Sequence, residues 1–330
     1  MPLPDLKKSK IVVAGASGFI GSNLVRYFLN QNYSVRGILR QRPPVVVDDR
    51  IEYVHADLAT KEGCRLAVRD ADYLFMCAAQ TAGAAVMAAD PLSQVTPNVL
   101  INTQLLQAAY EARIKKTVFI SSSAAYPPTG ITPVKEEQMF DGDPHEVYFS
   151  VGWMKRYAEI LCKIYAQKVP NPMPVAVVRP SNIYGPFDKF DFKTSHVTAA
   201  LLRRVVERHQ PLEVWGDGSD IRDLIFVDDF IEGMMKVFHA PDPYVAVNLA
   251  SGQGTTVRQI LETLLEVDGY KDANIRYLKD KPRTIPARFV DTTLAEKKFG
   301  FKPAHSLKEG FKKTISWYRM NPYGGDRVRA

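Results

Sequence analysis

The chain has 330 residues, 46% of them hydrophobic, so it can bury one large core or a large and a small one. Its formal net charge of +7 is spread along the chain without a long basic run, which argues against nucleic-acid binding, and its three scattered cysteines lack metal-ligand spacing. No apolar run reaches the roughly 20 residues of a membrane-spanning helix and the amino terminus is too short and polar for a signal peptide, so we expect a cytoplasmic protein without a metal, a membrane partner or a nucleic-acid partner.

The first half of the chain alternates short apolar runs with patterns typical of amphipathic helices. The apolar runs are rich in Val, Ile, Leu and Phe and cover residues 10–16, 34–40, 51–58, 73–79, 116–123 and 175–186. The helical patterns lie between them, at residues 21–31, 61–71, 98–114 and 146–160. This alternation predicts a parallel sheet covered by helices on both faces, which is an α/β fold of the doubly wound Rossmann type.

The second half of the chain has a more mixed pattern. A loop rich in Asp, Lys and Phe at 186–195 leads to a helix at 197–209, then to short strands, further helices and a Pro-rich segment at 281–288. We interpret residues 1–185 as the Rossmann domain, to which some later segments return, and residues 186–330 as a smaller mixed α/β substrate-binding lobe. Open α/β sheets bind ligands at the carboxyl ends of their strands, so we expect the lobe to cover that edge.

A glycine-rich turn separates the first strand from the first helix. The sequence VVAGASGFIG places Gly15, Gly18 and Gly21 there. The first glycine permits a tight turn, the second lets the backbone approach a pyrophosphate, and the third allows close packing of helix on strand. The pattern at this position predicts a dinucleotide-binding turn, with further contacts from Ser17, Phe19 and Ile20.

The end of the second strand bears on which dinucleotide is bound. Proteins that bind NAD place Asp or Glu there to accept hydrogen bonds from the ribose 2′-OH, whereas this chain has Arg40 and, two residues later, Arg42. Guanidinium groups pair with a 2′-phosphate, so we favour NADP over NAD; the alternative is that both arginines only solvate a loop. Asp57 and Leu58, after the third strand, are expected near the adenine ring, and Ala78, after the fourth, is a further expected cofactor contact.

Several motifs, in their order and spacing, resemble the extended short-chain dehydrogenase/reductase family, in the branch that acts on nucleotide sugars. The likeness covers about residues 10–320 and rests on the segments GASGFIG, HADL, NVLINT, ISSSAAYP, RPSNIYGP and GDGSDIRDLIFVDD. The segment NIYGPFDKFDFKTSHVTAALLRR is similar to the corresponding part of GDP-L-fucose synthases, which are NADPH-dependent epimerase/reductases of GDP-4-keto-6-deoxymannose.

The resemblance implies catalytic roles for particular residues. Ser122 corresponds to the catalytic Ser or Thr of the family, and Lys155 to the lysine of a Y-x-x-x-K pair that hydrogen-bonds the nicotinamide ribose. The tyrosine of that pair, which donates or removes a proton on the sugar oxygen, corresponds to Val151. The fucose synthases also exchange protons at the epimerised carbons through a Cys and a His; the His corresponds to His196, but Ala124 occupies the Cys position.

The missing tyrosine leaves the source of the proton open. Loss of a general acid typically slows a reaction about 10²–10⁴-fold. Ser122, Lys155 or a bound water could supply the proton, or Tyr148 could swing into the gap from about one helical turn earlier. The remaining account is an inactive chain, either natural or made by substitution of the tyrosine at position 151.

The missing cysteine bears on the type of reaction. With only His196 left of the proton-exchanging pair, a 4-keto reduction, a C4 epimerisation or a single epimerisation is favoured over a double epimerisation at C3 and C5. The 4,6-dehydratases of the family carry Asp-Glu directly after the catalytic Ser or Thr, whereas Ser123 and Ala124 follow Ser122 here, which argues against dehydration. An imidazole near a helix start can also serve only to hydrogen-bond backbone, and that alternative stays open for His196.

The substrate is expected to be a nucleotide-activated hexose, with guanine as its base inferred from the resemblance only. The residues expected to bind it, each of which could instead be a surface or packing residue, are Ser123, Asn182, Arg204, Trp215, Arg222 and Arg288. The resemblance also implies a homodimer in which the Lys155 helix and the helix at 98–114 form a four-helix bundle; burial of their apolar stripes inside a monomer is the competing explanation.

The sequence thus predicts an NADP-dependent reductase or epimerase that acts at C4, and in a wider reading at C3 and C5, of a GDP-linked hexose. A C4 epimerase that keeps its NAD(P) bound is the alternative within the same class. A protein that binds NADP or a nucleotide sugar without catalysis is the alternative from another class.

Overall fold

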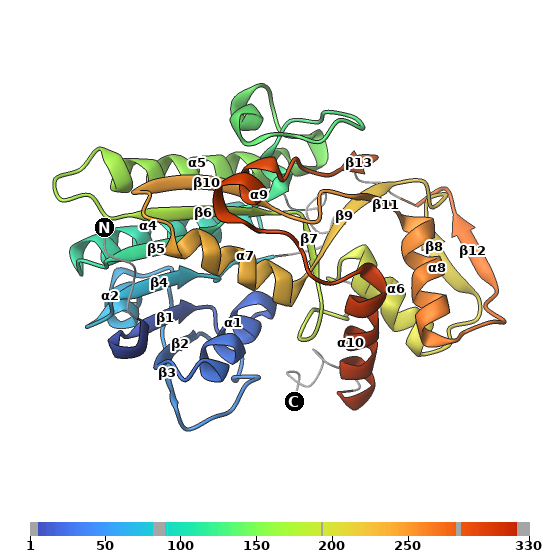
Figure 1. Ribbon diagram of the computed structural model, residues 1–330, viewed down its shortest axis with the longest axis horizontal. Helices are drawn as coiled ribbons and strands as arrows, with labels where there is room; N and C mark the ends of the chain where they lie inside the picture. The colour runs from blue at the N-terminus through green and yellow to red at the C-terminus, as the bar shows by residue number, and fades with distance from the viewer. Residues whose placement is uncertain (1–5, 82–89, 91, 193, 282–284, 322–330) are drawn as a thin grey trace.

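The structure is a computed structural model that describes residues 6–81, 90, 92–192, 194–281 and 285–321 (Figure 1). Within these residues, seven parallel strands form one sheet in the order β10-β6-β5-β4-β1-β2-β3. The strands are β1 (Ile11–Ala14), β2 (Val35–Leu39), β3 (Ile51–His55), β4 (Tyr73–Met76), β5 (Lys116–Ile120), β6 (Val175–Pro180) and β10 (Tyr244–Leu249). The chain runs outward from β1 to β3 and then returns to the other side of β1, so the switch point of the topology lies between β1 and β4.

Helices cover both faces of this sheet because alternate side chains of each buried strand point to opposite faces. On β1, Ile11 and Val13 pack with one apolar cluster, while Val12 and Ala14 pack with another. The first cluster includes side chains of α1 (Phe19–Asn30) and α7 (Val227–His239). The second includes side chains of α2 (Lys61–Val68), α4 (Val95–Glu111) and α5 (Phe149–Gln167). The Rossmann-type α/β fold predicted from the sequence is confirmed.

The remaining described elements lie mostly beyond the carboxyl ends of the main strands, at the right of Figure 1. A second sheet contains β7 (Asn182–Tyr184), β9 (Ile221–Phe226), β11 (Gly254–Thr256) and β13 (Ala287–Arg288), and β8 (Leu212–Trp215) pairs with β12 (Ile275–Leu278). The helices here are α6 (Val197–Val206), α8 (Val257–Asp268), α9 (Thr293–Phe299) and α10 (Leu307–Met320). The apolar cluster under α1 and α7 continues into α6, α8 and α10, so this part shares its core with the main sheet.

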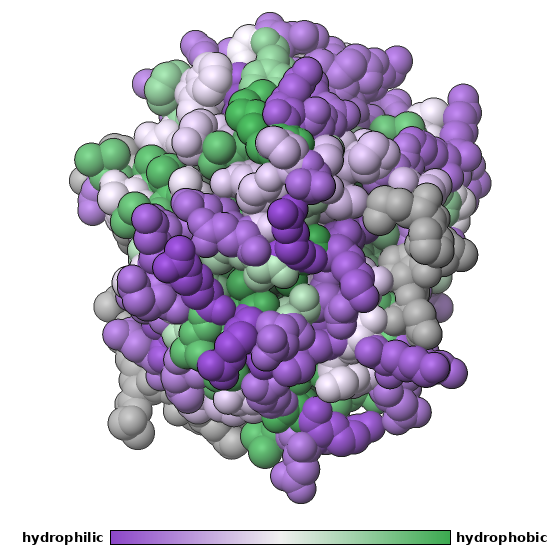
Figure 2. Space-filling model, turned by 90° about the vertical axis from the view of Figure 1, so that its left-hand side faces the viewer, coloured by the Kyte–Doolittle hydropathy of each residue, from purple (hydrophilic) through white to green (hydrophobic). Residues whose placement is uncertain are grey.

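The surface has a mainly polar face at one end of the molecule (Figure 2) and a line of exposed apolar side chains on α5. Figure 2 views the end of the molecule from which the main strands start, and hydrophilic side chains dominate this face, with hydrophobic groups in separate patches. In contrast, α5 carries a line of exposed apolar side chains at helical spacing, and Leu100 of α4 is exposed as well. The line on α5 consists of Phe149, Trp153, Tyr157, Ile160 and Ile164, and we call it the α5 stripe. Among the described residues, no helix is long and apolar enough to span a bilayer.

Candidate active site at the carboxyl ends of the strands

The glycine-rich turn after β1 has the geometry that close approach of backbone requires. Gly15 has φ +83°, and a Cβ at this position would lie 2.7 Å from the Cα of Ala78, beyond the end of β4. A Cβ on Gly21 would lie 2.1 Å from the carbonyl oxygen of Gly15. Gly18 is the N-cap of α1 and offers no side chain to the first amides of the helix. The turn therefore exposes a helix N-terminus whose partial positive charge and N–H groups suit an anion.

The other predicted cofactor residues lie along the same edge of the sheet. Arg40 and Arg42 follow β2 and are exposed. Asp57 follows β3, and its carboxylate accepts a hydrogen bond of 3.0 Å from the backbone N–H of Ala59, in the turn that leads into α2. Leu58 is buried: its side chain packs into the core, and its carbonyl oxygen accepts a hydrogen bond of 3.1 Å from the Cys64 thiol.

Lys155 and Ser122 lie at the end of β5. The Lys155 ammonium donates a hydrogen bond of 2.8 Å to the carbonyl oxygen of Ile120, the last residue of β5, and lies 5.0 Å from the ring centroid of Phe119. Desolvation lowers the pKa of Lys155 to about 8, against the opposing charge of Glu159 one helical turn later. Ser122 caps a short 3₁₀ turn (Ser123–Ala125), and its hydroxyl accepts a 3.0 Å hydrogen bond from the Ala124 N–H.

The start of α5 packs tightly on that 3₁₀ turn. A Cβ at Gly152 would lie 3.1 Å from the carbonyl oxygen of Ala124 and 2.5 Å from the Cβ of Pro144. Val151, the neighbour of Gly152, is half-buried in the first turn of α5, one turn before Lys155. Its isopropyl group carries no acidic proton, so the side chain at position 151 cannot act as a proton donor.

Tyr148 lies near a pair of arginines. It is the N-cap of α5, and the guanidinium of Arg288 lies 4.3 Å from the centroid of its ring. Arg288 on β13 is directly in register with Arg222 on β9. Desolvation lowers the pKa of Arg288 to about 10, with a further lowering from the charge of Arg222, and its Nη2 has no hydrogen-bond partner among the described residues.

Arg222 and Asn182 are held by backbone groups of neighbouring strands. Nη1 of Arg222 donates to the carbonyl oxygens of Ile221 and Ile285 at 2.8 and 2.9 Å. The Asn182 amide, at the start of β7, donates to the carbonyl oxygen of Asp223 at 3.2 Å. The buried carboxylate of Asp223 in turn accepts hydrogen bonds from Ser251, Gly252 and Val290. The sheet therefore brings Arg222, Arg288 and Asn182 to one side of the site.

The other predicted substrate residues form a separate group. The guanidinium of Arg204, on α6, lies 4.6 Å from the ring centroid of Phe192 and close to Glu213 of β8. Trp215 ends the same strand and is 49% exposed, with the Lys281 ammonium 5.9 Å from its ring centroid. No contact described in the structure joins these residues to the pair formed by Arg222 and Arg288.

His196 is the N-cap of α6, but its side chain makes no capping hydrogen bond. The residue as a whole is exposed, while desolvation of the imidazole and the charge of the Lys189 ammonium both lower the pKa of His196. A neutral imidazole at neutral pH is able to accept a proton. The alternative in which this histidine only caps its helix finds no support in the hydrogen bonds of the described residues.

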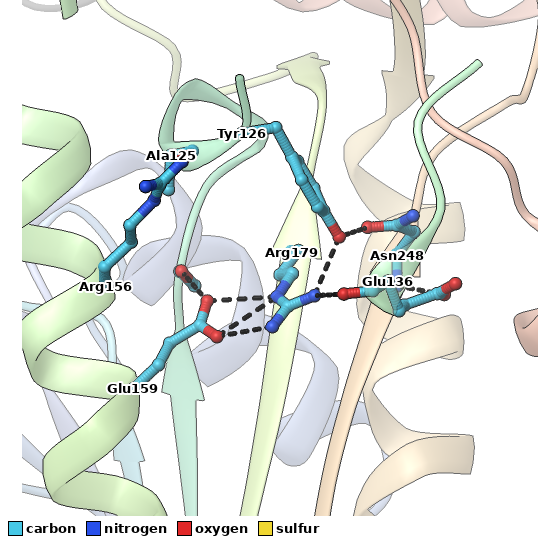
Figure 3. A network of polar contacts seen from close by, with 8 residues as sticks. Ala125, Tyr126, Glu136, Arg156, Glu159, Arg179 and Asn248 are labelled. Carbon is cyan, nitrogen blue, oxygen red and sulfur yellow. Dashed lines mark hydrogen bonds and ion pairs between the residues drawn. The ribbon is translucent and has the colours of Figure 1, made fainter. Parts of the chain in front are cut away.

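Sequence reasoning missed a buried network that includes Glu159, one helical turn after Lys155 on α5 (Figure 3). Glu159 on α5 forms an ion pair of 2.6 Å with Arg179 on β6, and it also accepts a hydrogen bond of 2.5 Å from Ser121 at the end of β5. Arg179 continues the network to the hydroxyl of Tyr126 at 2.8 Å, and that hydroxyl donates to Asn248 of β10. Two signals could have indicated it: Glu159 follows Lys155 by one helical turn, and Arg179 interrupts an otherwise apolar strand.

Comparison with known proteins identifies the family. Residues 11–250 match the NAD dependent epimerase/dehydratase family. The chain belongs to this family. It is 27% identical to GDP-L-fucose synthase of Escherichia coli, over 98% of this chain and 100% of that protein, and 26% identical to GDP-mannose 3,5-epimerase 1 of Oryza sativa, over 95% and 82%.

Solved structures of nucleotide-sugar epimerases share the fold of this chain. UDP-glucose 4-epimerase of Thermotoga maritima, solved with UDP-glucose, superposes with a TM-score of 0.83 at 24% identity, and the match covers 94% of this chain and 99% of that one. The resemblance noted in the sequence is therefore confirmed, and so is the expectation that this epimerase/dehydratase family member is an enzyme of the short-chain dehydrogenase/reductase type.

Proposed function

We propose that the chain is an NADP-dependent reductase or epimerase that acts at C4 of a nucleotide-activated, GDP-linked hexose. The observation that carries this proposal is the position of the Lys155 ammonium, bonded to the end of β5 beside Ser122, with the glycine-rich turn on the neighbouring side of the sheet. Names of relatives support the substrate class, since GDP-L-fucose synthases and GDP-mannose epimerases match nearly the whole chain.

The glycine-rich turn fits a dinucleotide because side chains at Gly15 or Gly21 would collide with backbone there. The first amides of α1 would hold the pyrophosphate, Arg40 and Arg42 the 2′-phosphate, and Lys155 the nicotinamide ribose. Asp57, Leu58 and Ala78 would line the adenosine and nicotinamide halves. When bound, the nicotinamide would exchange a hydride with C4 of the sugar.

The sugar nucleotide is proposed to lie on the opposite side of Lys155. Arg222 and Arg288, adjacent in register and with one guanidinium nitrogen unpartnered, suit the two charges of a diphosphate. Asn182 and Ser123 would contact the sugar, whereas Arg204 and Trp215 would contact the distal part of the nucleotide. Guanine rests on the names of the relatives alone.

We propose Tyr148 as the acid. It lies two helical turns from Lys155 on the same face of α5, and its ring already lies at the arginine pair expected to hold the diphosphate. No hydrogen bond of its hydroxyl is described, so the phenol is able to donate to a substrate oxygen. The Ser122 hydroxyl accepts a hydrogen bond from the Ala124 N–H and keeps its own proton, so Ser122 is the alternative donor.

A substitution series tests the function and the acid together, using a GDP-4-keto-6-deoxyhexose and NADPH. Tyr148→Phe keeps the ring against Arg288 and is expected to lower kcat about 10²-fold or more, with little change in NADPH affinity. Val151→Tyr is expected to raise kcat, since it restores a phenol one turn from Lys155. Full activity of Tyr148→Phe would contradict the role of Tyr148. If wild type binds both ligands without turnover, and Val151→Tyr does not restore turnover, the chain is better explained as a binding protein.

An epimerase that keeps its cofactor is the second candidate, supported by the rice GDP-mannose 3,5-epimerase among the relatives. The cofactor balance separates the two candidates. A reductase consumes one NADPH for each sugar converted, whereas an epimerase shows no net consumption.

We also propose that the protein forms a homodimer through α4 and α5. The α5 stripe and Leu100 support this, because five exposed apolar side chains in line on one helix are costly to leave in water. The occupant we propose is the same surface of a second copy, which would complete a four-helix bundle.

A further inference from the structure

The segment that follows β7 is attached to the start of α1. The side-chain amide of Asn23, in the second turn of α1, donates a hydrogen bond of 2.8 Å to the carbonyl oxygen of Pro186. One turn later, the guanidinium of Arg26 lies 5.5 Å from the ring centroid of Phe187. These contacts attach the chain to the second and third turns of α1 just before it reaches Lys189.

Lys189 then contacts the segment that follows β4. Its ammonium donates a hydrogen bond of 2.5 Å to the hydroxyl of Thr81, in the segment that follows β4. Desolvation lowers the pKa of Lys189, and the charge of Arg42, in the segment that follows β2, lowers it further. The ammonium therefore contacts the segment that follows β4, and the positive charge in the segment that follows β2 acts on it.

The order of the strands indicates where the Lys189 ammonium lies relative to the glycine-rich turn. Because β1 lies between β4 and β2, the turn from Gly15 to Gly21 lies between the segments that carry Thr81 and Arg42. A side chain near both segments, on a backbone attached to α1, lies above that turn. This is where the first amides of α1 face an anion.

The charges around Lys189 favour an anionic ligand. The neighbouring carboxyl, Asp188, is buried and accepts a hydrogen bond of 2.7 Å from the Lys189 backbone N–H rather than from its ammonium. Burial raises the pKa of Asp188 to about 7, so it is a weak counter-ion at neutral pH. Two other titratable groups interact electrostatically with Lys189: the charge of Arg42 lowers the pKa of Lys189, and the charge of Lys189 lowers the pKa of His196. Neither group carries a negative charge.

We propose that Lys189 binds the pyrophosphate of the dinucleotide, on the side opposite the amides of α1. The inference rests on the proposed cofactor site and adds to it a ligand from the part of the chain expected to bind the sugar. The dinucleotide would then be held between α1 and the segment that follows β7.

The test compares the affinities of Lys189→Gln and wild type for NADPH, NADH and GDP by calorimetry. Both dinucleotides carry the pyrophosphate, so Lys189→Gln is expected to raise both Kd values about tenfold while the Kd of GDP stays unchanged. Arg40→Gln is the matched control: it also removes one positive charge, but it should weaken NADPH and spare NADH. Lys189→Arg keeps the charge and should retain most of the affinity, which excludes a folding defect at this position.

Three results would overturn the proposal. The first is that Lys189→Gln binds all three ligands as wild type does. The second is weaker binding of NADPH alone, which would assign the lysine to the 2′-phosphate, and the third is weaker binding of GDP alone, which would assign it to the sugar nucleotide. If wild type binds neither dinucleotide, the proposed function fails and this inference fails with it.

Discussion

Burial disfavours the charged form of Lys155. Its ammonium lies against the ring of Phe119 and has one described hydrogen bond, to the carbonyl of Ile120. Desolvation lowers the pKa of Lys155 from 10.5 to about 8. Such strain is common at functional positions, where a group is placed for chemistry at the expense of stability.

This strain predicts a pH-dependent difference in stability between wild type and Lys155→Met. Between pH 8 and 10.5 the unfolded chain binds the proton and the folded chain does not, so the free energy of unfolding rises with pH in this window. We expect Lys155→Met to be more stable than wild type at pH 7 by on the order of 1–2 kcal/mol, after the lost hydrogen bond is counted, and the gap to close towards pH 10.5. Urea unfolding of both proteins across this range measures it, and a gap that does not change with pH would contradict the desolvation of Lys155.

At the scale of elements, the Glu159–Arg179 network joins four of them. It ties α5 to β5 through Ser121 and to β6 through Arg179, and it reaches β10 through Asn248 (Figure 3). Because Lys155 is one turn before Glu159 and bonds the residue before Ser121, the same network sets the position of the proposed catalytic lysine.

The network predicts an unequal cost for single and double substitutions. Glu159→Gln leaves the Arg179 guanidinium buried without a counter-ion and should lower the free energy of unfolding by about 3–5 kcal/mol. Glu159→Leu combined with Arg179→Met removes both charges and should cost less than Glu159→Gln alone. Denaturant unfolding measures both. Glu262→Gln, at an exposed position of α8, is the control expected to change little, and a small cost for Glu159→Gln would mean that solvent reaches the pair.

For the whole molecule, the α5 stripe predicts the assembly state. Trp153→Glu together with Ile160→Glu would place two charges in the proposed four-helix bundle and should convert a dimer into a folded monomer. Met320→Glu, an exposed apolar position at the end of α10, is the matched control and should leave the dimer intact. Light scattering after size exclusion gives the mass, and a wild-type monomer would contradict the proposal.

The main sheet could be predicted from the sequence because buried parallel strands read as continuous apolar runs and the glycine-rich turn marks where β1 meets α1. The position of Lys155 followed for the same reason, since it lies on a long helix next to a clear strand. The position of β10 beside β6 could not be predicted, because the apolar pattern of a strand does not indicate which other strand it pairs with.

The parts of the site that escaped prediction depend on long-range contacts. Glu159 and Arg179 lie on different elements, and each looks like an ordinary charged residue when read alone. Lys189 lies in a loop rich in charge, where nothing local distinguishes it from a solvated lysine. Arg222 and Arg288 were expected at the substrate, but their adjacency depends on the pairing of β9 with β13, which no sequence pattern fixed.

That adjacency affects how the protein should be handled. Desolvation and the charge of Arg222 both lower the pKa of Arg288, and this repulsion costs part of the folding free energy even though Asp220 forms an ion pair with Arg222. A multivalent anion cancels this repulsion. Preparations that carry GDP or inorganic pyrophosphate through purification should therefore tolerate heat and long storage better than preparations from which every polyphosphate has been stripped.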